Sequence, residues 1–197
     1  MQNDYEKLLE QIRQDAESHV KKSRYEHSVR VAETAEKMCA LYGADCKKGY
    51  LAGIAHDICK DYPLEELYEL ASKDGREITE LEKRKSELLH GRAAAVRLSE
   101  VYGIDDKEIL EAVSCHTFGS ASLGKLGKII FAADKIEPGR PQSTEEYRKN
   151  LFSKDLDSLV LQVLEENKAY LEKNGKEMAR ESLDFLASLK NKTGGEK

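Results

Sequence analysis

The chain has 197 residues, of which 40% are hydrophobic and 35% are charged, and its formal net charge is −5. This acidic balance argues against nucleic-acid binding as the main activity, because affinity for a duplex rests on neutralising phosphates with Lys and Arg. Only three prolines are present and the charges are mixed in sign. Such a composition is typical of helices rather than sheets, so we expect a single all-α domain over residues 1–197.

Helix-capping residues and glycines mark the predicted element boundaries in the first 140 residues. Ser23 with Glu26 predicts one capping box, and Thr79 with Glu82 predicts another. Asp45 and Asp105 are expected to cap two further helices. The predicted core helices span residues 23–43, 45–58, 63–75, 79 onwards, 91–102, 105–116 and 128–137.

After Pro138 the chain becomes more charged, and three amphipathic helices are predicted at residues 144–152, 155–173 and 176–190. The second of them carries an apolar stripe formed by Leu156, Leu159, Val160, Val163 and Leu164. No strand pattern and no internal repeat stands out. We therefore expect a helical bundle over residues 20–140, with C-terminal helices at residues 144–190 packed on it.

Neither a membrane segment nor a secretion signal is visible in the sequence. No apolar run approaches the roughly 18 residues that a membrane span requires, and Met1 is followed by a polar stretch. The four cysteines form no C-x-x-C pair. We expect a cytoplasmic protein with reduced thiols and no membrane contact.

An imidazole and a carboxylate stand side by side at His56-Asp57, inside the apolar segment Leu51–Ile58 that is predicted to be helical. Burying this pair would be costly without partners, and a metal cation would satisfy both side chains at once. A hydrogen-bonded His–Asp pair that ties two helices together is the alternative.

Two further positions place the same chemistry on other predicted helices. His27 lies one turn into the helix that starts at Ser23, and Asp134 ends the apolar segment Phe131–Asp134. Convergence of His27 and Asp134 with the His56-Asp57 pair would form a mixed nitrogen and oxygen site. Such a site suits iron, manganese, zinc or nickel better than magnesium.

His90 and His116 each lie at a predicted helix end. Either could complete a second metal site bridged by Asp57, donate to a substrate phosphate, or cap a helix at the surface. His19 has no comparable context and is left out of the site.

The ordered set H…HD…H…H…D on helices resembles the HD-domain superfamily of metal-dependent phosphohydrolases, and its finer match is to the YqeK family. The G-Y-P element of the HD-GYP phosphodiesterases is absent. The matching segments are Arg24–Ser28, Ala55–Lys60, Leu89–Gly91, Cys115–Thr117 and Ala133–Arg140.

This resemblance implies a symmetrical bis(5'-nucleosyl)-tetraphosphatase, which hydrolyses diadenosine tetraphosphate to two ADP. It implies an iron centre of one or two ions at His27, His56, Asp57 and Asp134, with His90 and His116 beside it. It also implies phosphate contacts from four residues, which are Arg24, Lys60, Thr117 and Arg140.

The residues themselves support these phosphate roles. Lys60 follows Asp57 by three positions, so the two would share one side of a helix, and both are our candidate catalytic residues. Arg24 precedes His27 by three, and Arg140 follows a Pro-Gly turn that would fold it back over the site. Arginine and lysine could stabilise charge on a departing nucleotide during metal-assisted hydrolysis.

Two rival functions remain open from sequence alone. One is an HD-type nucleoside monophosphatase, and the other is a non-catalytic module that senses nucleotides. The expected partner is a small nucleotide in each case, and a homodimer is left open.

Overall fold

The computed structural model describes residues 2–193 of the chain, and within this range it contains helices and loops but no strand. The predicted all-α class is therefore confirmed. Within the same range, no helix is long and apolar enough to cross a membrane. The helices are α1 Gln2–His19, α2 Lys22–Tyr42, α3 Cys46–Ala55, α4 Leu64–Ser72, α5 Glu80–Arg84, η1 (a 3-10 turn) Ser86–Leu89, α6 His90–Tyr102, α7 Lys107–Cys115, α8 Lys125–Ile136, α9 Glu145–Phe152, α10 Leu156–Lys173 and α11 Arg180–Thr193.

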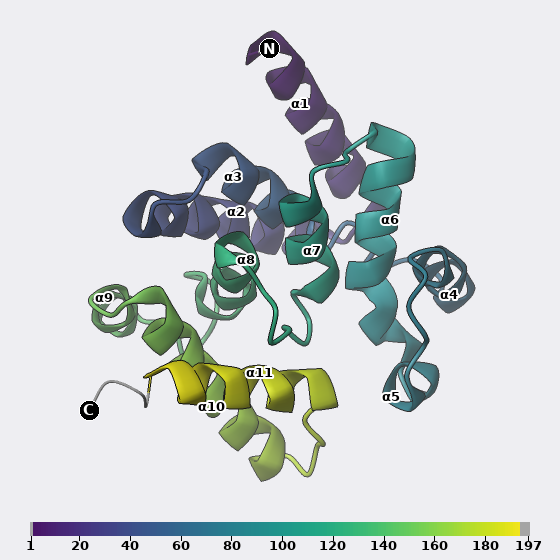
Figure 1. Cartoon of the computed structure of the whole chain (residues 1–197). Helices are drawn as coiled ribbons and strands as arrows, with labels where there is room; N and C mark the ends of the chain where they lie inside the picture. Colours follow the sequence, from purple (N-terminus) through teal and green to yellow (C-terminus); the bar gives the residue numbers. More distant parts are fainter. Residues whose placement is uncertain (1, 194–197) are drawn as a thin grey trace.

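Helix α8 is the centre of the bundle (Figure 1). It packs against α2, α3 and α7 on one side and against α10 on another. Ile129, Ile130 and Phe131 are almost fully buried. A helix that is apolar over most of its circumference must be enclosed in this way, because any exposed face would leave hydrophobic surface in water.

Helices α2 and α3 form the most extensive helix pair in the molecule. A Cβ atom added at Gly53 would lie 2.5 Å from Ala32 Cα, which is closer than real Cβ contacts allow. The absence of a side chain at Gly53 therefore permits the close approach of the two helices. This pair holds the segments that carry His27 and His56.

Helix α3 ends at Ala55, so the expectation that the His56-Asp57 pair lies inside a helix is wrong. Both residues occupy a turn in which Lys60 N donates to Asp57 O at 2.8 Å. The cause is local: His56 Nδ1 lies 2.7 Å from Gly53 O, the carbonyl that the Asp57 amide would reach if the helix continued. Because the helix ends here, the adjacent side chains of His56 and Asp57 can point towards the same site.

The capping predictions have mixed outcomes. The box of Thr79 and Glu82 is confirmed. The predicted box at Ser23 is wrong, because α2 starts directly after Lys21, whose side chain makes no capping hydrogen bond. The backbone amide of Lys21 instead donates to the carboxylate of Asp61, which is distant in sequence, at 2.9 Å. The cap of α7 is Asp106 rather than its neighbour.

The C-terminal helices follow the predicted pattern, with Thr144 capping α9 and Asp155 capping α10. Helix α11 begins at Arg180, later than expected. The apolar stripe of α10 packs on α8, and α11 packs on α10, at the end of the molecule opposite α1 (Figure 1).

A candidate metal centre

The six histidine and aspartate side chains singled out from the sequence meet at one place. His27 comes from α2, and His56 and Asp57 come from the turn after α3. The other three are His90 at the start of α6, His116 directly after α7, and Asp134 in α8. The four imidazoles are almost completely buried, as is Asp57.

The first group of ligand atoms is formed by His27, His56, Asp57 and Asp134. His27 Nε2 lies 3.1 Å from Asp134 Oδ1 and 3.9 Å from Asp57 Oδ2. His56 Nε2 lies 3.6 Å from Asp57 Oδ2 and 3.8 Å from Asp134 Oδ1. Two imidazole nitrogens and two carboxylate oxygens thus face one another.

The second group uses the other oxygen of Asp57. Asp57 Oδ1 lies 3.1 Å from His90 Nε2 and 3.6 Å from His116 Nε2. His27, His56 and Asp57 have the spacing of metal ligands, and so do Asp57, His90 and His116. Asp57 therefore bridges two adjacent groups.

Hydrogen bonds set the orientation of all four imidazoles. The Nδ1 atom of His56 faces the carbonyl of Gly53, as noted, and those of the other three face an acceptor at 2.7 to 3.0 Å. Because the acceptors carry no proton, each Nδ1 must be the protonated nitrogen, which leaves the Nε2 lone pairs directed into the centre. The three further acceptors are Glu137 for His27, the Glu87 carbonyl for His90 and the Val113 carbonyl for His116.

This arrangement fits a bound cation. His56 Nε2 is the one buried side-chain nitrogen or oxygen without a hydrogen-bond partner among the residues that the structure describes. His90 Nε2 and His116 Nε2 face each other at 3.1 Å, although both carry lone pairs. A cation would satisfy these atoms, and mixed imidazole and carboxylate donors suit divalent transition metals.

The protonation states also suit metal binding. Burial lowers the pKa of His56 to about 4 and lowers that of His116. Burial would raise the pKa of Asp57, yet the neighbouring imidazoles of His56, His116 and His90 hold it well below the ordinary value. The imidazoles of His56 and His116 are thus neutral and the Asp57 carboxylate is ionised near neutral pH, as ligation requires.

Side chains predicted to contact phosphate surround the two groups. Arg24 Nη1 donates to Asp57 Oδ2 at 2.9 Å, and Arg140 Nη2 donates to Asp134 Oδ1 at 2.5 Å. Lys60 Nζ lies 3.3 Å from both ring nitrogens of His90, and Thr117 Oγ1 lies 3.4 Å from the Nε2 atoms of His90 and His116.

Three residues of the centre escaped the sequence analysis. Lys135 Nζ lies 3.4 Å from Asp134 Oδ2, and burial lowers the pKa of Lys135. Glu137 binds both His27 and Arg30. Lys135 and Glu137 lie in the segment Asp134–Arg140, whose resemblance to the family could have pointed to them. No sequence pattern pointed to Arg30.

Two small cavities flank the centre. One, of about 230 Å³, is lined by Arg24, His27, Arg30 and Arg140 at the first group. The other, of about 220 Å³, is lined by Thr117, the neighbour of His116, and by charged side chains such as Arg92, Glu82 and Glu181, but by none of the candidate metal ligands. The first cavity is strongly cationic, as a phosphate-binding space requires.

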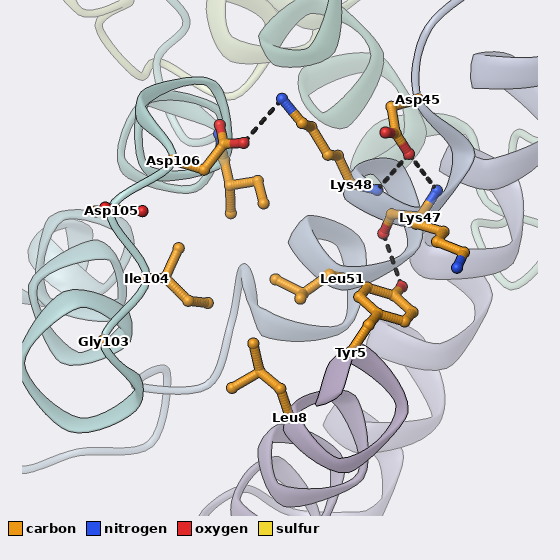
Figure 2. A pocket seen from close by; sticks show the side chains of 11 residues that line it. Tyr5, Leu8, Asp45, Lys47, Lys48, Leu51, Gly103, Ile104, Asp105 and Asp106 are labelled. Carbon is orange, nitrogen blue, oxygen red and sulfur yellow. Dashed lines mark hydrogen bonds and ion pairs between the residues drawn. The ribbon is translucent and has the colours of Figure 1, made fainter. Parts of the chain in front are cut away.

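A larger hollow of about 600 Å³ lies elsewhere, between α1, the start of α3 and the loop before α7 (Figure 2). Lys48 reaches Asp106 at 2.8 Å, and Tyr5 Oη donates to the Lys47 carbonyl at 2.9 Å. None of the candidate metal ligands lines this hollow.

Comparison with known proteins agrees with this geometry. The HD domain family model matches residues 24–139, which include every candidate metal ligand. The chain is 41% identical to a symmetrical bis(5'-nucleosyl)-tetraphosphatase of Staphylococcus aureus, over 67% of this chain and 68% of that protein. It is 32% identical to the Bacillus subtilis protein of the same name, over 85% of this chain and 88% of that protein.

A solved structure from Clostridium acetobutylicum shares the fold. It is described as a predicted HD superfamily hydrolase involved in NAD metabolism, and it is 30% identical to this chain with a TM-score of 0.86. The match covers 93% of this chain and 97% of that one. The likeness therefore includes the C-terminal helices as well as the residues around the metal centre.

Proposed function

This chain belongs to the HD domain family of metal-dependent phosphohydrolases, and on that premise we propose that it hydrolyses diadenosine tetraphosphate symmetrically to two ADP. Related dinucleoside polyphosphates are further substrates. The observation that carries the proposal is the carboxylate of Asp57, which faces two groups of imidazoles and accepts a hydrogen bond from Arg24. The relatives named as symmetrical tetraphosphatases, at 32 and 41% identity, support the choice of substrate.

The metal that we propose is iron. His27, His56, Asp57 and Asp134 would hold this ion, and His90, His116 and Asp57 would hold a second one. The donor set also accommodates manganese, nickel or zinc. Metal analysis of protein purified without added metal tests this choice, because iron should then be the main ion present. Protein that was active with only zinc or magnesium would contradict it.

A divalent ion at this site supplies Lewis acidity, which activates water and polarises a phosphoryl oxygen. The protein positions the reactants around it. Asp57 or Asp134 orients the attacking water, while Arg24 and Arg140 hold phosphate oxygens in their forked guanidinium groups. Lys60 neutralises negative charge that develops on the departing ADP.

The two flanking cavities support cleavage at the middle bridge of the substrate. They are of similar size; the first is lined by the ligand His27, and the second reaches the centre through Thr117, the neighbour of His116. A dinucleotide bound with one half toward each cavity would place the bridge between its second and third phosphates near Asp57. Positioning of this kind favours attack at the central bond.

Chromatography of the products tests the proposal. Diadenosine tetraphosphate should give ADP alone, and equal amounts of AMP and ATP would contradict symmetrical cleavage. A panel of nucleoside monophosphates tests the phosphatase alternative. Tight nucleotide binding without turnover, in protein with its full metal content, would instead favour a sensing module.

We further propose that residues 1–197 form one HD-type domain, in which the C-terminal helices pack on a core of about residues 20–140. The packing of α10 on α8 supports this organisation. Limited proteolysis should therefore not release a stable fragment that ends near residue 140.

A further inference from the structure

Glu137 is a buried carboxylate next to the metal centre, with only 1% of its surface exposed. Its Oε1 atom lies 3.0 Å from His27 Nδ1, and its Oε2 atom accepts a hydrogen bond from Arg30 Nε at 2.6 Å. The backbone amide of Gly139 also donates to Oε2. No rotation of this side chain is possible without breaking several of these bonds.

His27 differs from the other three imidazoles of the centre in the group that accepts the hydrogen bond from its Nδ1 atom. His56, His90 and His116 direct Nδ1 to backbone carbonyl oxygens, which are neutral. Only His27, among these four, has a carboxylate as its acceptor. A charged acceptor makes the imidazole a stronger metal donor and holds its ring in one orientation more firmly.

The same carboxylate joins the ligand to the segment that carries Arg140. Arg140 N donates to the Glu137 carbonyl at 3.0 Å, which closes the turn. A Cβ atom at Gly139 would lie 2.5 Å from Arg30 Nε, so a side chain there would displace the guanidinium from its place beside Glu137. Glu137 therefore links a ligand on α2 with the turn after α8.

We infer that Glu137 is a positioning residue, which orients His27 and makes its ion the more tightly held of the two. It binds no substrate and no metal itself. The inference rests on the proposed metal centre. It adds that Glu137 strengthens the first ion site beyond what its larger number of ligands provides, because only His27 among the four imidazoles has a carboxylate as the acceptor of its Nδ1 proton.

The chain offers a matched control in Asp15. Its carboxylate accepts from Arg97 at 2.9 and 2.8 Å and lies 2.9 Å from His19 Nδ1. Asp15 thus binds an arginine and a histidine, as Glu137 does, but none of these partners belongs to the metal centre. Asp15→Asn should lower stability without changing metal binding.

The experiment is a titration of chelator-treated protein with Mn²⁺, in which electron paramagnetic resonance measures the free ion. For Glu137→Gln, we expect the dissociation constant of the tightest binding event to rise about 10- to 100-fold. Any weaker event should be unchanged. Excess Mn²⁺ should restore hydrolysis in this variant, because His27 is still present and only its orientation is relaxed.

A second variant, Arg30→Met, tests the same inference if Glu137→Gln fails to fold. It leaves the Glu137 carboxylate in place but removes its arginine partner, so the same binding event should weaken to a smaller extent. Unchanged Mn²⁺ binding in Glu137→Gln, or equal weakening in Asp15→Asn, would overturn the inference. Wild-type protein that bound no Mn²⁺ would instead contradict the proposed metal centre.

Discussion

Arg140 Nη2 donates to Asp134 Oδ1 at 2.5 Å, and this oxygen also lies 3.1 Å from His27 Nε2. Asp134 Oδ1 is thus shared between Arg140, a candidate phosphate contact, and His27, a candidate metal ligand. Arg140 Nε also donates to the backbone carbonyl of Asp134 at 2.8 Å. A phosphate held by Arg140 would therefore lie beside the ligands.

Arg140→Ala and Lys60→Ala should keep the metal and weaken the binding of phosphate. As cations, neither side chain can ligate a metal, so metal content is expected to stay at the wild-type level. Loss of one charged contact should cost about 2–3 kcal/mol in the transition state. Steady-state kinetics measure this cost as a fall in kcat/KM, and unchanged kinetics in both variants would exclude these residues from the site.

His56→Ala should abolish both metal binding and hydrolysis. His56 is 0% exposed, and its Nε2 lone pair faces the carboxylates of Asp57 and Asp134. Metal analysis and an activity assay measure the two losses. His19→Ala is the control, since His19 lies outside the centre, and it should retain both. A His56→Ala protein with full metal and full turnover would show that the ligand assignment is wrong.

Gly53→Ala should destabilise the protein and loosen the metal centre together. The added methyl group would meet the backbone of Ala32 and push α2 away from α3, at a cost of about 1–3 kcal/mol. Thermal unfolding and metal content measure the two effects. Gly124→Ala is the matched control, because its nearest atom lies 4.0 Å away. Equal stability of the two variants would contradict the close packing of α2 on α3.

Chelator-treated protein should lose stability as the pH falls from about 6.5 toward 4. Burial lowers the pKa of His56 to about 4, whereas the unfolded value is near 6.5. Between these values the unfolded chain binds a proton that the folded chain does not, so acid favours unfolding. The lowered pKa of His116 acts in the same direction.

Melting temperatures of chelator-treated protein between pH 7.5 and 5 check this prediction. His56→Gln removes the titrating imidazole and should flatten the dependence relative to wild type. Since other acidic groups titrate in both proteins, the difference between the two curves isolates His56. Identical slopes would show that burial of His56 does not contribute to the acid sensitivity.

Local sequence patterns predicted the elements well where the causes are local. Thr79 and Glu82 form their capping box because both partners lie within one turn. The apolar run around Phe131 became the buried central helix, since a segment so rich in hydrophobic residues has no stable place at the surface. The start of α2 was predicted wrongly: the amide of Lys21, directly before the helix, binds the carboxylate of Asp61, a contact between residues distant in sequence that local patterns do not reveal.

The sequence by itself determined the chemistry of this protein: its helical class, the four histidines and two aspartates of the candidate site, and their order along the chain. Only the tertiary structure decided how these residues are arranged in space and which partners each of them contacts. The bridging position of Asp57, the pairing of Arg24 with Asp57 and the support of His27 by Glu137 depend on distances between different helices and the turns that follow them. Helix packing sets those distances, and residue spacing within one segment carries no information about them.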